Sequence, residues 1–471
     1  MATRLTTQDA SFYFLEAGTT PMHVGSLAVF RVPRNGFSYD DLLSIVESRL
    51  ALVPRYRQKV REVALGLARP VWVDDRDFDI TYHIRRSALP KPGSNEQLHD
   101  LVARLTSRPL DRTRPLWEMY LVEGLVRNRF AIFTKSHSSL VDGDKALEIS
   151  QVILDATKTP PTMAEELWMP SREPSESELV VQAVAEIIAR PGEGLEAVRS
   201  AVNDVARTAG GAVRALSKVA AVVRTAAQVA PSSPLNTEIS RNRRFAVAKT
   251  DLDDYRTVRS KFGGNINDVV LAVVAGALRN WLLSRGEPIS AFTTVRALVP
   301  MSVYVSGEGP DISDLAPSEV SSFLVDLPVG EPNAVVRFSH IAHATEATVR
   351  QSRGVTAGTL MRLSGFAPAT LHAMGARVGS SFSQRVFNLV VTNVPGPQFP
   401  LYVGGARMLE MYPVPPLVRN QALSIGLTSY DGNVYYGLNA DRDAMPDVEV
   451  ITSLLHESLE ELLDAARDSS R

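Results

Sequence analysis

A histidine at the end of a predicted buried strand is the first candidate for chemistry in this sequence. Residues 129–143 read RFAIFTKSHSSLVDG, and the apolar run 130–134 is typical of a buried strand. His137 follows on the loop that leaves this strand, and Asp142 and Gly143 come after it. An imidazole held rigidly in this way can act as a general acid or base near neutral pH. The alternative interpretation is a core strand followed by a polar turn.

Several common kinds of active site are excluded by the sequence. The chain has no cysteine, which excludes disulfides, thiolate metal sites and a cysteine nucleophile. It also lacks a P-loop, a strand-linked GxGxxG, an HExxH motif and a GxSxG elbow. His340 and His343 form a close pair, but further ligands for a metal are missing, so we interpret them as a solvated helix face.

Length and composition indicate a globular protein of more than one domain. The chain has 471 residues, so we expect two domains, with three as the alternative. It is 45% apolar and 22% charged, and its formal charge of −2 gives no reason to expect nucleic-acid binding. The N-terminus lacks a signal-peptide core, and we found no run of about 20 apolar residues. We therefore expect a cytoplasmic protein, at most peripheral on the inner face of the plasma membrane.

Strands and helices alternate through the first predicted domain, residues 1–160. The apolar patterns predict strands at 22–30, 70–73, 80–84 and 115–122, and helices at 37–50 and 96–107. This mixed order indicates an α/β (α+β layered) fold, in which helices cover a mixed sheet.

Residues 161–240 are predicted to be a helical linker punctuated by prolines. Between residues 195 and 229, apolar side chains recur at a spacing of three or four, which is typical of an amphipathic helix. Its later charges are all positive: Arg207, Arg214, Lys218 and Arg224. We favour a long helix packed on the domains; the alternative is a basic helix that docks on an anionic bilayer.

A second domain of the same mixed-sheet kind is predicted for residues 241–471. Helices are expected at 251–262, 267–283, 334–353, 358–375 and 447–467, and strands at 293–303, 321–326 and 387–393. The predicted strands 422–430 and 434–439 flank an Asp-Gly-Asn turn at 431–433, which predicts a β-hairpin. Asn267 is the expected N-cap of its helix, with Asp268 in the first turn.

A set of short motifs, taken together and in order, is specific for one family. The set comprises PLW at 115–117, HSxxxDG at 137–143, NDVV at 267–270 and TNVPGP at 392–397, together with LTTQDA at 5–10, MHVG at 22–25, RPLD at 108–111 and RALVP at 296–300. With these motifs the chain resembles the bacterial wax ester synthase/diacylglycerol acyltransferase family over nearly its whole length. That family is related to chloramphenicol acetyltransferase and to peptide-synthetase condensation domains. The resemblance implies two similar domains with an active site in a tunnel between them.

The resemblance also implies an activity, namely acyl transfer from acyl-CoA to the hydroxyl of diacylglycerol or of a long-chain alcohol. It implies no bound cofactor, with acyl-CoA as co-substrate, and it suggests a peripheral membrane or lipid-droplet surface as the place of action. The implied catalytic positions are His137, Ser138, Asp142 and Gly143. The implied tunnel or interface positions are Trp117, Asn267, Asp268, Thr392 and Asn393.

The sequence departs from the family pattern at the residue that should act as the base. The family motif is HHxxxDG, in which the second histidine takes the hydroxyl proton, whereas this chain has Ser138 there. A serine hydroxyl is not basic near neutral pH. Three hypotheses follow: His137 or an ordered water near Ser138 supports a slower transferase, Ser138 is a nucleophile with His137 as its base, or catalysis is lost and the protein binds lipid or acyl-CoA or partners an active paralogue. We favour the enzyme over the non-catalytic relative.

Other positions have structural interpretations beside the functional ones. A second departure, SEVS at 318–321, stands where we expect asparagine followed by a polar or basic residue. We interpret Trp117 chiefly as a core anchor, and Asp142 as an ion-pair or turn residue for which Arg296 is one possible partner. Asn267 and Asp268 fit a plain helix N-terminus, whereas Thr392 and Asn393 fit substrate binding and turn formation equally well.

Overall fold

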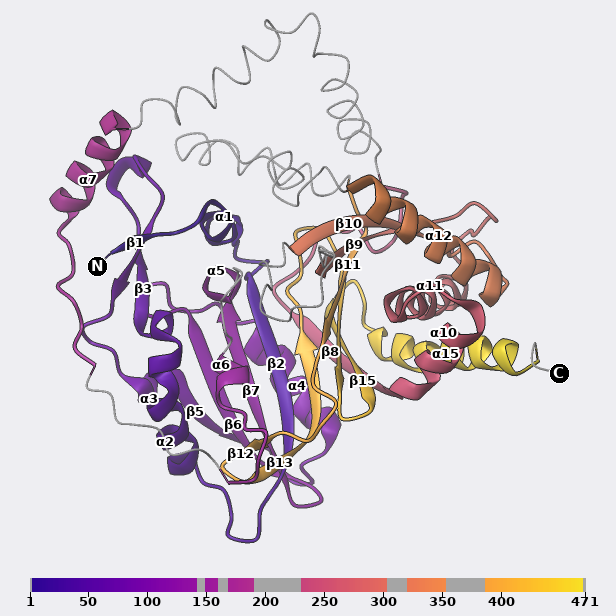
Figure 1. Ribbon diagram of the computed structural model, residues 1–471, viewed down its shortest axis with the longest axis horizontal. Coiled ribbons are helices and arrows are strands. Elements are labelled where there is room, and N and C mark those ends of the chain that lie inside the picture. Colours follow the sequence, from indigo (N-terminus) through magenta and orange to yellow (C-terminus); the bar gives the residue numbers. More distant parts are fainter. Residues whose placement is uncertain are drawn as a thin grey trace, which may run out of the picture.

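Two six-stranded sheets lie side by side in the protein, each with its own set of helices (Figure 1). The computed structural model describes residues 2–141, 149–159, 168–189, 230–302, 320–352 and 386–468. Within them, the first sheet has the strand order β12-β13-β2-β7-β6-β5, and the second has the order β10-β9-β11-β14-β15-β8. The two mixed sheets covered by helices agree with the predicted fold class.

The first sheet is centred on the strand that carries the candidate histidine. Its strands are β2 (His23–Arg31), β5 (Ile84–Ala88), β6 (Trp117–Leu125), β7 (Arg129–His137), β12 (Tyr402–Val403) and β13 (Ala406–Val414). Strand β7 pairs antiparallel with β2 on one side and with β6 on the other. Its helices include α2 (Tyr39–Arg49) and α4 (Asn95–Thr106), both close to the predicted bounds.

A small sheet and three short helical segments lie beside the first large sheet. The small sheet joins β1 (Thr3–Arg4), β4 (Val71–Asp74) and β3 (Gln58–Arg61); α1 spans Thr7–Leu15, and η2 spans Pro54–Arg57. The strand predicted at residues 80–84 is wrong, because α3 (Ile80–His83) occupies most of it. The Asp79 side chain caps this turn by accepting the Thr81 N–H at 2.9 Å, and β5 begins only at Ile84.

The second sheet is built from the C-terminal part of the chain. Its strands are β8 (Arg243–Asp251), β9 (Val295–Ser302), β10 (Val320–Leu327), β11 (Leu389–Pro395), β14 (Leu423–Tyr430) and β15 (Asn433–Asp441). Its helices are α10 (Leu252–Phe262), α11 (Ile266–Ser284), α12 (Ala334–Ser352) and α15 (Val448–Asp468). The predicted hairpin is confirmed: β14 and β15 pair antiparallel, and Asp431 and Gly432 have positive φ angles of 44° and 80° at the turn.

Strand β13 departs from the predicted domain division, since it belongs by sequence to 241–471 but lies in the first sheet. It pairs antiparallel with β2, with Val414 opposite Gly25. It also packs against the second sheet, where a Cβ at Gly437 would lie 1.7 Å from the Pro413 carbonyl oxygen. The absence of a side chain at Gly437 therefore permits the close approach of β13. The first sheet therefore includes strands from the C-terminal part of the chain, and the two halves are not separate along the sequence.

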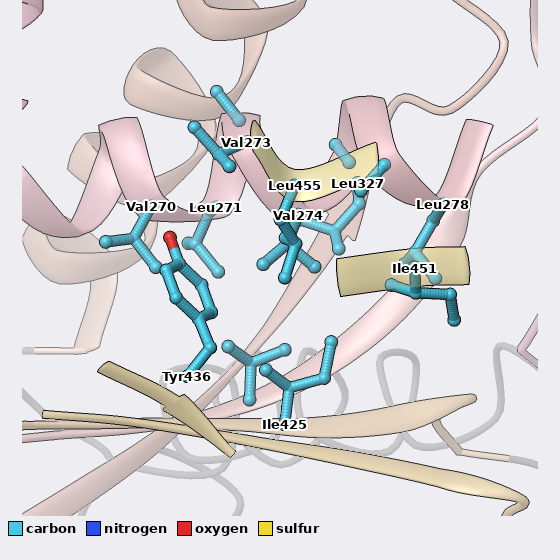
Figure 2. Close-up of a cluster of buried hydrophobic side chains, with 14 of the residues drawn as sticks. Val270, Leu271, Val273, Val274, Leu278, Leu327, Ile425, Tyr436, Ile451 and Leu455 are labelled. Atoms are coloured by element: carbon cyan, nitrogen blue, oxygen red, sulfur yellow. The ribbon is translucent and has the colours of Figure 1, made fainter. Parts of the chain in front are cut away.

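Helix α11 forms the core of the second half. Its sequence is apolar on all sides, and thirteen of its nineteen residues are buried. Val270, Val274 and Leu278 face Ile451 and Leu455 of α15 and the sheet below them (Figure 2). Its length and apolar character would also suit a membrane span, but 72% of that window is buried within the fold. We interpret it as a core helix.

Three predicted features lie outside the described residues. They are the basic helix at 195–229, the helix at 358–375 and the first two residues of the SEVS stretch at 318–321. Within the described residues of the predicted helical linker, 168–189 and 230–240, the helix is α7 (Glu176–Ala189).

Candidate active site

The HSxxxDG motif spans the junction between a strand and a short helix. His137 is the last residue of β7 and does not lie on the loop after the strand as predicted; it lies opposite His23 of β2. Ser138 begins α5 (Ser138–Val141). Asp142 and Gly143 lie outside the described residues. The strand extends to His137 because the His137 N–H donates to the Leu116 carbonyl at 2.9 Å.

The ring of His137 is enclosed, and its Nδ1 atom is already occupied. The side chain is 1% exposed. The Ser139 N–H donates to Nδ1 at 3.1 Å, and the Ser139 hydroxyl oxygen lies 2.7 Å from the same atom. A backbone N–H can only donate, so Nδ1 is the acceptor and the neutral ring carries its proton on Nε2. His137 thereby caps the first turn of α5.

Burial also keeps this imidazole neutral. It lowers the pKa of His137 to about 3; the Glu16 carboxylate opposes this shift, whereas His23 and Arg112 add to it. Nε2 lies 3.8 Å from a Glu16 oxygen and has no hydrogen-bond partner within the described part of the chain. A neutral ring with a protonated Nε2 and an occupied Nδ1 is poorly arranged to take a proton from substrate.

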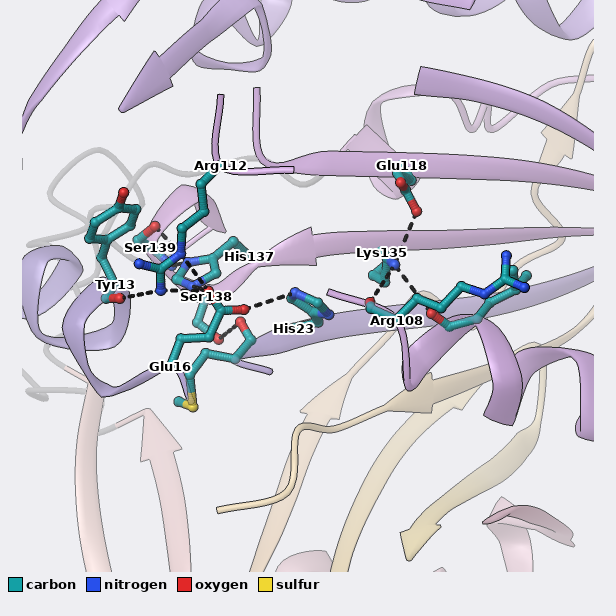
Figure 3. Close-up of polar contacts among 12 residues, drawn as sticks. Tyr13, Glu16, His23, Arg108, Arg112, Glu118, Lys135, His137, Ser138 and Ser139 are labelled. Atoms are coloured by element: carbon teal, nitrogen blue, oxygen red, sulfur yellow. Dashed lines mark hydrogen bonds and ion pairs between the residues drawn. The ribbon is translucent and has the colours of Figure 1, made fainter. Parts of the chain in front are cut away.

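Glu16 is the centre of the buried polar cluster around His137 (Figure 3). Arg112 donates to Glu16 Oε2 from Nη2 at 2.7 Å and from Nε at 3.0 Å, and its guanidinium lies over the Tyr13 ring. His23 Nε2 lies 3.3 Å from Glu16 Oε1. Burial alone would raise the pKa of Glu16, but its contacts with His23, His137 and Arg112 outweigh burial and lower this pKa to about 2. Glu16 is therefore ionised at neutral pH.

Within the part of the chain that the structure describes, Ser138 makes no contact of the kind that a catalytic nucleophile needs. Its hydroxyl donates to the Met22 carbonyl at 3.0 Å, and its N–H donates to the same oxygen at 2.8 Å. The hydroxyl proton is thus held by a backbone carbonyl rather than by the imidazole of His137. It is Ser139, fully buried, that contacts this imidazole. The arrangement argues against a Ser138 nucleophile with His137 as its base.

A second buried ion pair lies two residues back on the same face of β7 (Figure 3). Lys135 is 1% exposed and its Nζ lies 3.0 Å from Glu118 Oε2. The ammonium also donates to the carbonyls of Leu105 and Arg108, at 3.2 and 3.0 Å. These carbonyls lie at and beyond the C-terminal end of α4, where a positive charge is favourable. Side chains two apart on a strand share a face, so this pair lies on the side of His137.

Trp117 is a buried core residue, in agreement with its structural interpretation. It is fully buried, and its indole N–H donates to the Tyr56 carbonyl at 2.8 Å. His83 stacks on the indole with ring centroids 4.6 Å apart. Its indole N–H and its ring thus contribute to packing within the first half.

The NDVV motif forms the start of α11, but its cap differs from the prediction. The N-cap is Asn265, not Asn267: its side chain accepts the Asp268 N–H at 3.0 Å, and Asp268 Oδ2 accepts the Asn265 N–H at 2.9 Å. The two residues form a capping box that begins the helix earlier than predicted. Asp268 also accepts the Thr345 hydroxyl at 2.6 Å, and burial raises its pKa. Asp268 is therefore structural.

The NDVV and TNVPGP motifs meet in space. Asn393, near the end of β11, donates from Nδ2 to Asn267 Oδ1 at 3.4 Å, and both side chains are half-buried. Thr392 lies opposite Gly426 on the parallel neighbour β14 and is also half-buried. Asn267 and Asn393 thus form a polar contact at this end of the second sheet.

The remaining candidates have structural partners or are exposed. Arg296 binds Asp326 through two nitrogens, at 2.7 and 3.1 Å, whereas Asp142 as its partner lies outside the described residues. His340 and His343 are exposed on α12, as predicted. In the described ranges, no group of three histidine or acidic residues is placed to bind a metal.

Sequence analysis did not assign Glu16, Arg112 or Ser139 to the site. His23 belonged to a family-like stretch, but no role was given to it. The Glu16–Arg112 pair joins residues far apart in sequence, and its linear pattern carries no signal. The chain that follows Glu16 also reaches the second half, because Arg243 donates to the Thr19 carbonyl. The cluster therefore lies close to the junction of the two halves.

Comparisons with known proteins agree on one family. The wax ester synthase/diacylglycerol acyltransferase catalytic domain matches residues 5–270, and the C-terminal domain of the same family matches residues 318–463. A probable diacylglycerol O-acyltransferase of Mycobacterium tuberculosis, tgs3, is 59% identical over 263 residues, which cover 56% of this chain and 97% of that protein. Another from that organism, tgs1, is 35% identical over 449 residues, covering 94% and 92%.

Solved structures show the same fold along nearly the whole chain. The wax ester synthase/diacylglycerol acyltransferase from Marinobacter aquaeolei VT8 superposes with a TM-score of 0.69 at 28% identity, covering 98% of this chain and 99% of that one. The starter condensation domain of rhizomide synthetase RzmA, in a mutant form, shares the fold with a TM-score of 0.57 at 12% identity, covering 99% and 94%. The predicted two-domain architecture is thereby confirmed.

Proposed function

This chain belongs to the wax ester synthase/diacylglycerol acyltransferase family, and on that basis we propose that it transfers a fatty acyl group from acyl-CoA to a hydroxyl. The acceptor is diacylglycerol or a long-chain alcohol, so the product is a triacylglycerol or a wax ester. The observation that supports this most strongly is the match of both family domains, which together account for most of the chain. The names of the mycobacterial relatives favour diacylglycerol as the acceptor.

The reaction requires the acceptor oxygen to attack the thioester carbonyl while its proton is removed. The oxygen forms the new ester bond, the C–S bond breaks, and the CoA thiolate leaves and is protonated. In this chain the position of the family base is Ser138, whose hydroxyl proton is held by Met22. Losing a general base typically slows such a step by about 10²–10⁴-fold. We propose that turnover here depends mainly on holding the thioester and the hydroxyl together, with water accepting the proton.

Asn267 and Asn393 are the polar groups that we propose for binding substrate in the second half. The Asn393 amide donates to Asn267 Oδ1 at 3.4 Å, which joins the two motifs in space. A side-chain amide at such a junction can donate a hydrogen bond that stabilises negative charge on the thioester oxygen. This role follows from their meeting at the end of β11 and from the half-exposed state of both side chains.

A second candidate function is favoured by the state of His137 and Ser138. The His137 imidazole is enclosed and neutral with its Nδ1 occupied, and the Ser138 hydroxyl donates to a backbone carbonyl. A protein with this arrangement can bind acyl-CoA or lipid without turning it over, alone or as the partner of an active paralogue.

Release of free CoA from palmitoyl-CoA, with diacylglycerol or hexadecanol as acceptor, distinguishes the two functions. We expect slow release by the wild type and release faster by about 10²-fold in Ser138→His, which restores the imidazole. Activity that vanishes in His137→Ala, with the fold intact by circular dichroism, would instead place the base at His137. No release by the wild type, with activity appearing in Ser138→His, would establish a binding protein whose base has been lost.

We further propose that the protein works at the inner face of the plasma membrane or at a lipid-droplet surface. The proposed acceptors are lipids that dissolve in such surfaces, and the basic sequence at 195–229 suits anionic headgroups. Flotation with liposomes that contain or lack acidic lipid measures this directly. Failure to float with either liposome at any salt concentration would contradict the proposal.

A further inference from the structure

The two faces of β7 carry different networks at the end that bears the motif. His137 and Lys135 face the buried charges, whereas Ser136 faces the opposite side, with Trp117 directly across in register. On that side lies Tyr56, the third residue of η2, which is 1% exposed. It is not part of any motif that identified the family.

The ring and backbone of Tyr56 are fixed by Trp117. The two rings meet edge to face with centroids 5.5 Å apart and planes inclined by 64°. The Trp117 indole N–H donates to the Tyr56 carbonyl at 2.8 Å. Trp117 therefore holds both the side chain and the main chain of Tyr56, which gives the PLW motif a specific structural purpose.

The hydroxyl of Tyr56 contacts both ends of the segment that carries HSxxxDG. It accepts the Ile149 N–H at 3.1 Å, at the start of α6 (Ile149–Val152), where a helix N–H needs a partner. It also lies 3.4 Å from the Ser136 hydroxyl, immediately before His137. One phenol oxygen thus joins the residue that precedes the motif to Ile149 of α6, which follows the motif in sequence.

We propose that Tyr56 is a positioning residue for the acyl-transfer site, acting through Ser136 and Ile149 rather than on substrate. The expected effect of Tyr56 on the rate of acyl transfer rests on the proposed function. Its expected effect on the order of the residues around the HSxxxDG motif does not. A shift of about 1 Å in a reacting group can cost about 10²-fold in rate. Losing this shared contact therefore lowers kcat while leaving the binding of acyl-CoA little changed.

Tyr56→Phe tests the proposal, because it removes the hydroxyl and keeps the ring that packs on Trp117. The matched control is Tyr430→Phe: Tyr430 is also 1% exposed, and its hydroxyl accepts the Leu401 N–H at 2.9 Å and donates to the Met408 carbonyl at 3.1 Å. Each substitution thus removes one buried tyrosine hydroxyl that accepts a backbone N–H. Both are made in the wild type and in Ser138→His, so that one background with turnover is available.

Amide hydrogen exchange is the first readout. We expect the peptide containing Ile149–Val152 to exchange about 10-fold faster in Tyr56→Phe, with no change there in Tyr430→Phe. Unchanged exchange of this peptide in Tyr56→Phe would overturn the proposal, whether or not the protein is an enzyme. If Tyr56→Phe does not fold, Ser136→Ala removes the other contact of the hydroxyl, and it must raise exchange in the same peptide for the proposal to stand.

The second readout is the kinetics of CoA release from palmitoyl-CoA. We expect kcat to fall about 10-fold in Tyr56→Phe, with KM changed less than about twofold, while Tyr430→Phe keeps both values. A rise in KM with an unchanged kcat would overturn the positioning role. Faster exchange together with no turnover in either background would support the contact to the motif and reject the proposed transferase.

Discussion

The motif end of β7 and the helix α11 are both buried, but their interiors differ in kind. Around β7 the interior holds charges: Lys135 with Glu118, and Glu16 between Arg112 and two histidines. Around α11 it is mainly aliphatic and aromatic (Figure 2), and the buried Arg337 and Ser458 approach the helix at Gly276. Burying charges is costly unless they are paired. The charged interior therefore coincides with the family motif, whereas the apolar interior provides stability.

The largest effect expected from this comparison is the loss of one partner of the Lys135–Glu118 pair. Lys135→Met leaves the Glu118 carboxylate buried with Arg85 as its remaining cation, at 3.2 Å, and should cost about 3–5 kcal/mol of unfolding free energy. Urea unfolding monitored by circular dichroism measures it. The matched apolar change is Leu455→Ala beside α11, expected to cost about 2–5 kcal/mol through its cavity.

The two regions should then differ in how a second substitution acts. Adding Glu118→Gln to Lys135→Met removes the carboxylate that has lost its ammonium partner and should recover part of the loss. Leu455 is apolar, so its replacement leaves a cavity and no unpaired charge that a second substitution could remove. A Lys135→Met cost below about 1 kcal/mol would mean that the pair is solvated and that the contrast between the interiors is wrong.

A smaller effect is expected from acidification, and it should come from the β7 region. The pKa of His137 is lowered from 6.5 to about 3 in the folded protein. Between these two pH values the imidazole is protonated in the unfolded chain and neutral in the folded chain. Its contribution is fully present above pH 6.5 and is lost progressively as the pH falls from 6.5 towards 3. Between pH 7 and pH 5 the free energy of unfolding of the wild type should fall by about 2 kcal/mol because of His137.

His137→Gln isolates that contribution, because the amide can still accept the Ser139 N–H but does not titrate. Between pH 7 and pH 5, the free energy of unfolding should fall by about 2 kcal/mol less in the variant than in the wild type, as measured by urea unfolding at each pH. Equal losses in the two proteins would show that the imidazole is not held neutral. Glu16, whose pKa is lowered to about 2, adds a loss only below pH 4.5, outside this window.

The smallest effect is expected at the N-terminus of α11. Asp268→Asn removes a negative charge from the first turn and weakens the capping box with Asn265, which should cost about 1 kcal/mol. CoA release should be unchanged at equal folded fraction, because Asp268 is a structural residue. A loss of turnover much larger than the loss of folded protein would mean that Asp268 contributes to the substrate site.

The local elements could be predicted because their signals are local. The apolar run before His137, the mostly apolar sequence of α11 and the Asp-Gly turn between β14 and β15 each specify one element by residue type or backbone preference. The exceptions are equally local: Asp79 caps a helical turn where β-prone residues predicted a strand, and Asn265 caps α11 two residues before Asn267. The replacement of the family base by Ser138 is also visible in sequence alone.

Only the tertiary structure decided what the candidate residues do. Register brought His23 opposite His137, and Glu16 and Arg112 meet there from distant parts of the chain. Strand β13 crosses from the second half into the first sheet because glycines leave room for it. Tautomer, charge and access depend on such partners, and partners are chosen by packing and not by neighbours in sequence. For this reason the sequence identified the family, whereas the fold showed that His137 is enclosed and that the Ser138 hydroxyl is held by Met22.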